Sequence, residues 1–158
     1  AFAEQGLGVV KAVGDLAGPT AFALLMGTAR LLFSKCTLRL SAERALPLCA
    51  GLCLVSYLLA SLPASPVLGL LGCALCGFSV GILWPATFSL AAARIRGGGT
   101  AMFAFLALAG DLGCAGGPAL VGLASGALGG NLRLGILCAA AFPVLLLLAL
   151  LVNHRMSR

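Results

Sequence analysis

Long stretches without charge alternate with short charged or glycine- and proline-rich segments, and this alternation predicts the helices. No Asp, Glu, Lys or Arg occurs from 45 to 93. That stretch is too long for one membrane-spanning helix, which needs about 20 residues. Two prolines within 62–66 predict a turn inside it, because proline is poorly tolerated in a helix interior. We therefore expect two spans there, over 45–62 and 67–91.

The rest of the chain divides in the same way. Between Arg96 and Arg133 the only charged residue is Asp111, and a glycine-rich turn follows. A further uncharged run with Pro143 inside it predicts one last span. The expected fold is an all-α, polytopic membrane helix bundle with spans at about 15–34, 45–62, 67–91, 100–124 and 134–153, and residues 1–10 forming the tail of a preceding helix. Because the chain begins with Ala1 rather than Met, we expect a fragment or a processed product.

Composition supports the membrane interpretation. Hydrophobic residues make up 61% of the 158 residues, charged residues 9%, and the mean hydropathy is +1.15. Soluble domains carry about 25% charged residues, and disordered chains need high charge and few apolar groups. Both classes are therefore excluded, as is a small disulfide-stapled module.

The charges also predict an orientation. One set of predicted loops is basic, whereas the segments 62–66 and 126–133 carry no charge and one Arg respectively. Basic loops usually lie on the cytoplasmic side, near anionic lipid. We therefore expect a cytoplasmic C-terminus and no nucleic-acid partner, with cytoplasmic-loop residues Arg30, Lys35, Arg39, Arg44, Arg94 and Arg96.

Asp111 is the most informative single residue. It lies about 12 residues into its predicted span, hence near mid-membrane. An ionisable group there is costly and usually faces a cavity or a partner. Two interpretations stay open: a carboxylate that couples protons or contacts a solute, and a structural carboxyl that is protonated or bonded to a neighbouring helix.

The dipeptide Trp84-Pro85 is the second distinctive feature. Pro85 removes a backbone hydrogen bond and bends its helix, and an indole can form an apolar cavity wall with one donor. Thr87 and Phe88 follow one turn later. We expect Trp84, Thr87, Phe88 and Asp111 to line a substrate cavity, the alternative for Trp84 being a lipid-facing aromatic side chain.

Glycines and cysteines favour packing roles. Glycines four residues apart, such as Gly77 and Gly81, allow helices in lipid to approach closely. The seven cysteines lie mostly within predicted spans and lack the partners of a zinc site. No motif of a hydrolase, metalloprotease, P-loop or dinucleotide-binding enzyme occurs, so we expect neither an enzyme nor a cofactor or metal.

Several segments resemble the major facilitator superfamily. The stretch from Gly27 to Arg39 resembles a degenerate second copy of the loop signature G-x-x-x-D-R-x-G-R-R, with Leu38 in the Asp position. Trp84-Pro85 and the segment 94–103 look like the tenth helix, a short loop and the start of the eleventh. The segment 110–118 is similar to the eleventh helix of bacterial sugar-permease-like members. The similarity covers nearly the whole chain, from the end of helix seven to helix twelve.

The resemblance implies the C-terminal half of a secondary transporter in a bacterial cytoplasmic membrane. Such proteins move a small solute by rocking two halves around a central site. The implied partners are the lipid bilayer, a small-molecule substrate with a proton or sodium ion as candidate coupling ion, and the missing N-terminal half. The alternative is a membrane scaffold or subunit that does not transport and uses its glycine faces for assembly.

Overall fold

Long helices make up almost all of the structure. The computed structural model describes residues 11–36, 41–62 and 65–156, and in these ranges it contains helices and turns but no strand. The helices are α1 (Lys11–Cys36), α2 (Ala42–Ser61), α3 (Pro66–Arg94), α4 (Gly99–Ala127), α5 (Leu132–Ala139) and α6 (Ala141–Met156).

The apolar stretches form helices close to where the sequence predicts them. Within the described ranges, five segments are long and apolar enough to cross a bilayer: Leu16–Lys35, Ala42–Ser61, Val67–Arg94, Gly99–Ala127 and Leu132–Asn153. The fold is therefore that of a multi-pass membrane protein. The predicted helix tail at 1–10 lies outside the described residues.

The last predicted span is found as the apolar segment Leu132–Asn153, but the helix in it is interrupted. Helix α5 ends at Ala139 and α6 begins at Ala141. Pro143 has no N–H to donate, and its ring would clash with the carbonyl four residues earlier, which is that of Ala139. The backbone N–H of Ala140 instead donates to the Leu137 carbonyl at 3.1 Å, a tighter turn that separates the two helices.

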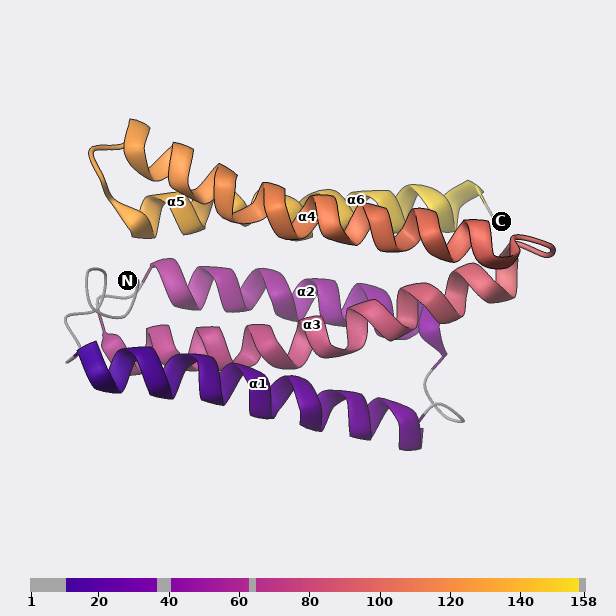
Figure 1. Cartoon of the computed structure of the whole chain (residues 1–158), viewed down its shortest axis with the longest axis horizontal. Helices are drawn as coiled ribbons and strands as arrows, with labels where there is room; N and C mark the ends of the chain where they lie inside the picture. Colours follow the sequence, from indigo (N-terminus) through magenta and orange to yellow (C-terminus); the bar gives the residue numbers. More distant parts are fainter. Residues whose placement is uncertain (1–10, 37–40, 63–64, 157–158) are drawn as a thin grey trace.

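The helices form two layers (Figure 1). In the first layer, α3 packs against both α1 and α2. The second layer contains α4 with α5 and α6, and it meets the first where α2 contacts α5 and α6. Helix α4 packs mainly on α5, and Ser125 is the one buried residue among those described in it.

Small residues bring α3 against α1. A Cβ at Gly77 would collide with the backbone carbonyl of Phe22, and one at Gly81 would lie 2.7 Å from the Met26 carbonyl oxygen. Close approach of this kind replaces the hydrophobic driving force that is absent in lipid. The predicted packing role of this glycine pair is therefore confirmed. A buried cluster that includes Ala29, Phe33 and Leu46 continues the contact among α1, α2 and α3.

Turns at the two ends of the bundle use glycine where the backbone requires it. Gly97 has φ +82° in the turn between α3 and α4, and Gly129 has φ +70° after α4. Side-chain-bearing residues rarely adopt such angles. After the second turn, the Asn131 side chain caps α5 by accepting hydrogen bonds from the N–H groups of Arg133 and Leu134.

The ends of the helices separate the charges. The C-terminal ends of α1, α3 and α6 and the N-terminal ends of α2 and α4 lie at the same end of the bundle (Figure 1). We call this the basic end; its charged residues are Lys35, Glu43, Arg44, Arg94, Arg96 and Arg155. The opposite end contains Arg133 and, in the first turns of α1, Lys11 and Asp15, so it carries less net positive charge.

Candidate functional site

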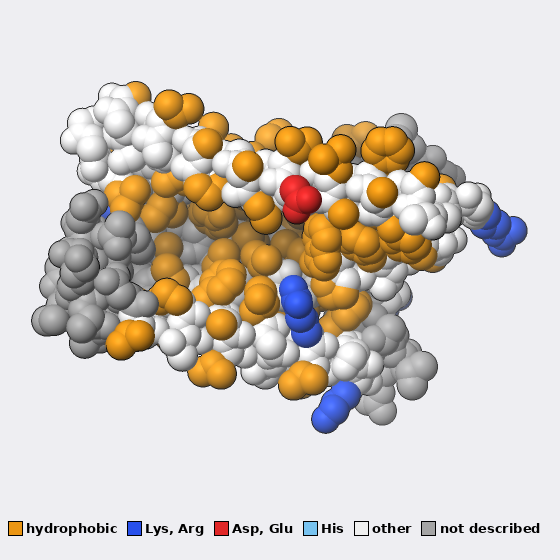
Figure 2. Space-filling view, in the orientation of Figure 1, with side chains coloured by type: hydrophobic (Ala, Val, Ile, Leu, Met, Phe, Trp, Pro, Cys, Tyr) orange, Lys and Arg blue, Asp and Glu red, His pale blue; other side chains and the backbone are white. Residues whose placement is uncertain are grey.

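A cavity of about 930 Å³ lies between the two helix layers. Its lining residues come from all six helices and are mostly small or apolar. Figure 2 shows the hollow with hydrophobic side chains inside it. Its volume is in the range of small-molecule sites, which are typically about 300–1,000 Å³ and mostly apolar with a few polar groups.

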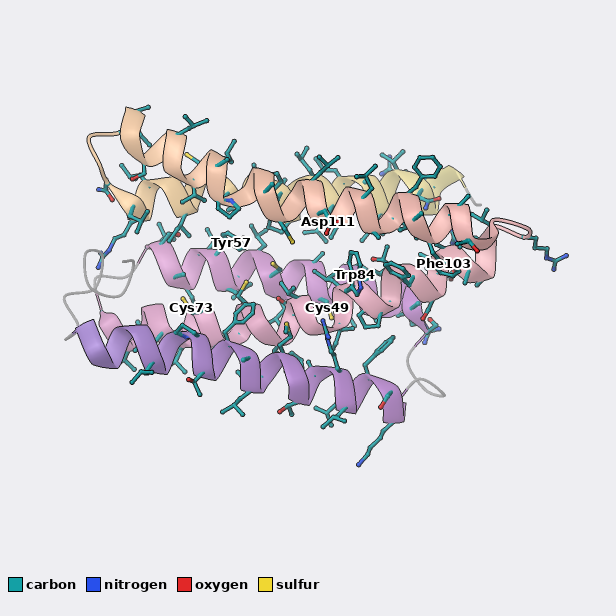
Figure 3. The ribbon with its side chains drawn as sticks, viewed as in Figure 1. Cys49, Tyr57, Cys73, Trp84, Phe103 and Asp111 are labelled. Atoms are coloured by element: carbon teal, nitrogen blue, oxygen red, sulfur yellow. The ribbon has the colours of Figure 1, made fainter. Side chains whose placement is uncertain are left out.

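Trp84 of α3 packs against α4 at this cavity. Its side chain lines the hollow and lies between the two helices (Figure 3). A Cβ built at Gly110 would be only 2.6 Å from two carbons of the indole, so the glycine allows the ring to lie against the α4 backbone. Gly110 immediately precedes Asp111, and both residues line the cavity.

Phe88 and Thr87 differ from Trp84 in position. The Phe88 ring packs 4.6 Å from the Trp84 ring and 5.6 Å from the Phe103 ring of α4, measured between centroids. The Thr87 hydroxyl donates to the carbonyl of Leu83 at 2.7 Å. Neither residue is among the cavity-lining residues. Phe88 therefore packs against Trp84 outside the cavity wall. The Thr87 hydroxyl is used in a hydrogen bond to the backbone of its own helix.

Asp111 and Arg30 are the charged residues among the side chains that line the cavity. Asp111 lies near the middle of α4 and Arg30 within α1. Within the described part of the chain, no hydrogen bond or ion pair joins either side chain to another. Figure 2 shows the acidic side chain of α4 and a basic side chain of α1 on opposite sides of the hollow.

The position of Arg30 corrects the sequence prediction. The sequence places Arg30 in a basic loop, but it lies inside α1, six residues before the helix ends at Cys36. Apolar residues flank it on both sides, so the helix continues through it. Arg30 lies four residues before the end of the predicted span 15–34. This position is the signal that could have identified it as a helix residue rather than a loop residue.

The other predicted loop residues lie at the basic end, mostly on helices. Lys35, Arg44 and Arg94 lie at helix ends rather than in loops, Arg96 lies in the turn before α4, and Arg39 is outside the described residues. Arg94 donates to Glu43 at 2.8 Å and to Asn153 at 3.3 Å. This network ties together α2, α3 and α6.

Sequence reasoning missed two further features of the cavity wall. Tyr57 of α2 contributes its side chain, and Cys73, Cys76 and Cys114 line the wall rather than serving only as interhelical packing. Cys114 is an exposed free thiol. No group of three or more potential metal ligands occurs among the described residues. Hydropathy gives no signal for these positions, because cysteine and tyrosine also occur at helix contacts.

Comparisons with known proteins add no relative. No family model matches the chain, and no match was found among curated proteins or solved structures.

Proposed function

We propose that the chain forms part of a secondary transporter that carries a small solute across a bacterial cytoplasmic membrane by alternating access. The observation that carries this proposal is the cavity of about 930 Å³ between two helix layers, with the charged groups Asp111 and Arg30 in an otherwise mostly apolar wall. Both lie inside apolar helices, and ionisable residues at such positions typically belong to substrate or ion pathways.

The arrangement of the layers supports this function. Alternating access requires two states whose relative populations a solute can shift through different affinities. The two layers meet chiefly where α2 contacts α5 and α6, while α4 is almost unburied. Helix α4 could therefore move relative to the first layer without exposing a large buried surface.

The sequence resemblance to the C-terminal half of the major facilitator superfamily is a separate support for this proposal. In that arrangement, the chain contributes half of a central site and a second half closes the cavity. The basic end would face the cytoplasm, since positively charged segments are retained there.

Cys114 provides a test of alternating access that needs no known substrate. The thiol lines the cavity and is exposed. In a variant that keeps Cys114 as its only cysteine, a membrane-impermeant thiol reagent should react from either side of the membrane. A matched variant that keeps only Cys49, which is buried and outside the cavity wall, should react from neither side. Reaction of Cys114 from one side alone would contradict the proposal.

A second candidate function is a membrane scaffold or subunit that does not transport. It is favoured by α4, where a Cβ at Gly122 or Gly126 would meet no atom within 4 Å. Such an open small-residue face suits helix association in lipid. Two results together would favour this function. A bulky substitution at Gly122 would abolish association with a partner subunit, and the Cys114 thiol would react with the impermeant reagent from one side of the membrane only.

A further inference from the structure

The cavity presents opposite charges on two different helices. Arg30 lines it from α1 in one layer, and Asp111 lines it from α4 in the other. Figure 2 shows an acidic side chain on one layer and a basic side chain on the other, on the two sides of the hollow. The remaining lining residues carry no charge, so the wall as described is electrically neutral overall.

Both charges lie in the interior of apolar segments. Arg30 is about 9 Å from the end of α1, and Asp111 is about 18 Å from the start of α4, at about 1.5 Å per residue. Arg30 lies in the candidate span Leu16–Lys35 and Asp111 in Gly99–Ala127. A guanidinium stays protonated in proteins, and isolated charges in a low-dielectric interior are costly. Each group therefore favours a ligand of opposite charge.

The charge arrangement discriminates among solutes. A simple carboxylate would pair with Arg30 and leave Asp111 without a counter-charge, while a simple amine would do the reverse. A neutral polyol would compensate neither. A solute with one carboxylate and one ammonium group compensates both, and its charge-assisted hydrogen bonds are the strong ones.

We propose that this cavity binds a zwitterionic solute, with the carboxylate on Arg30, the ammonium on Asp111 and an apolar body against the wall. The inference rests on the proposed function for its direction across the membrane, but binding itself can be measured separately. Trp84 lies against Gly110, next to Asp111. Trp84 and Asp111 line the same cavity, and the face of an indole also attracts cations.

Binding to the purified protein tests the proposal. A ligand that binds the folded state raises the unfolding temperature by mass action. The probes are L-leucine, ε-aminocaproate and L-alanyl-L-alanine, which carry both charges at different separations. Isocaproate and isoamylamine are leucine without its ammonium and without its carboxylate, and mannitol is a neutral polyol. At least one zwitterion should stabilise the protein, whereas the three single-charge or neutral probes should not.

Substitutions then identify the charged groups. Arg30→Gln and Asp111→Asn should each weaken zwitterion binding by about tenfold or more, the usual effect of removing one partner of a charged hydrogen bond. Lys35→Gln is the matched control, because Lys35 lies on the same helix but outside the cavity wall. Arg30→Lys keeps the charge and should retain most of the binding, which separates a charge effect from misfolding of Arg30→Gln.

The outcomes separate this inference from the proposed function. Absence of zwitterion binding overturns the inference, and two-sided reaction of Cys114 would then still support transport. Equal binding of isocaproate, isoamylamine or mannitol also overturns it, as does zwitterion binding that neither Arg30→Gln nor Asp111→Asn weakens. Zwitterion binding that depends on both residues supports the inference whatever the result for Cys114. Reaction of Cys114 from one side only would contradict the proposed transport but not the proposed binding.

Discussion

Gly110 determines how closely α4 approaches Trp84. The indole occupies the space in which any other side chain would begin, with two ring carbons 2.6 Å from the position of a Cβ. Trp84 is in turn supported by Phe88, which stacks on Phe103. A single missing methyl group thus sets the spacing between the two helix layers at the cavity.

Gly110→Ala should destabilise the protein by about 1–3 kcal/mol, the usual cost of overpacking. The indole is large and is held by Phe88, so it has little room to move away. Thermal unfolding in detergent measures the effect. Gly116→Ala, on the same helix with nothing within 4 Å, is the control and should leave stability unchanged or slightly higher. Equal stability of the two variants would show that the contact is not rigid.

Arg30 shows where single-residue prediction from the sequence fails. Dividing the chain at its charges places every Arg or Lys in a loop, but a guanidinium facing a cavity can lie inside an apolar helix. The position of Asp111 within a long uncharged run is recognisable because no other charge lies nearby. Which neighbours these side chains meet depends on the packing of α1 and α4, and no local pattern encodes that.

Among whole elements, the glycine pairs behave differently from one another. Gly77 and Gly81 of α3 lie against the backbone of α1, whereas Gly113 and Gly117 of α4 line the cavity, and a Cβ added at either would meet nothing within 4 Å. The two pairs have the same spacing in the sequence. Spacing alone therefore predicts that a helix can approach a neighbour, and the fold decides whether it does.

Gly77→Ala should separate α3 from α1 and destabilise the protein, by about 1–3 kcal/mol. The new methyl group would collide with the Phe22 carbonyl, a backbone atom that cannot rotate away. The measurement is thermal unfolding in detergent. Gly122→Ala tests the same change on the open face of α4, where it should have little effect. A larger loss at Gly122 than at Gly77 would contradict the packing described here.

Helix positions are the most predictable part of the fold. Runs without charge and the prolines near Leu62 locate the long apolar helices, because each must satisfy its backbone hydrogen bonds internally in lipid. The break between α5 and α6 is not predicted, although Pro143 is visible in the sequence. Proline often only bends a membrane helix, so the sequence does not distinguish a bend from a break.

For the molecule as a whole, the ends of the bundle are electrically unlike. The basic end carries Lys35, Arg44, Arg94, Arg96 and Arg155 against Glu43, while the other end carries Lys11 and Arg133 against Asp15. The alternation of helix directions brings together segments that are far apart in the sequence (Figure 1). This arrangement is the one expected when positively charged segments are retained on one side of a membrane.

Reporter tags inserted into the two kinds of turn should therefore be found on opposite sides. A tag after Arg96 should face the cytoplasm, and a tag between Leu128 and Asn131 should face away from it, because α4 crosses the bundle between them. Protection of each tag from added protease in oriented vesicles measures its side. Both tags on the same side would rule out α4 as a membrane-spanning helix.

Because few residues of α4 are buried, the free-energy cost of displacing this helix from the first layer should be small. The Phe88–Phe103 pair helps to hold it against α3, and pairs of this kind contribute about 0.5–1.5 kcal/mol beyond the burial of their surface. The small number of buried residues in α4 means that little buried surface opposes a movement of this wall. A solute that binds more tightly when α4 has moved would shift the population toward that arrangement by its difference in affinity.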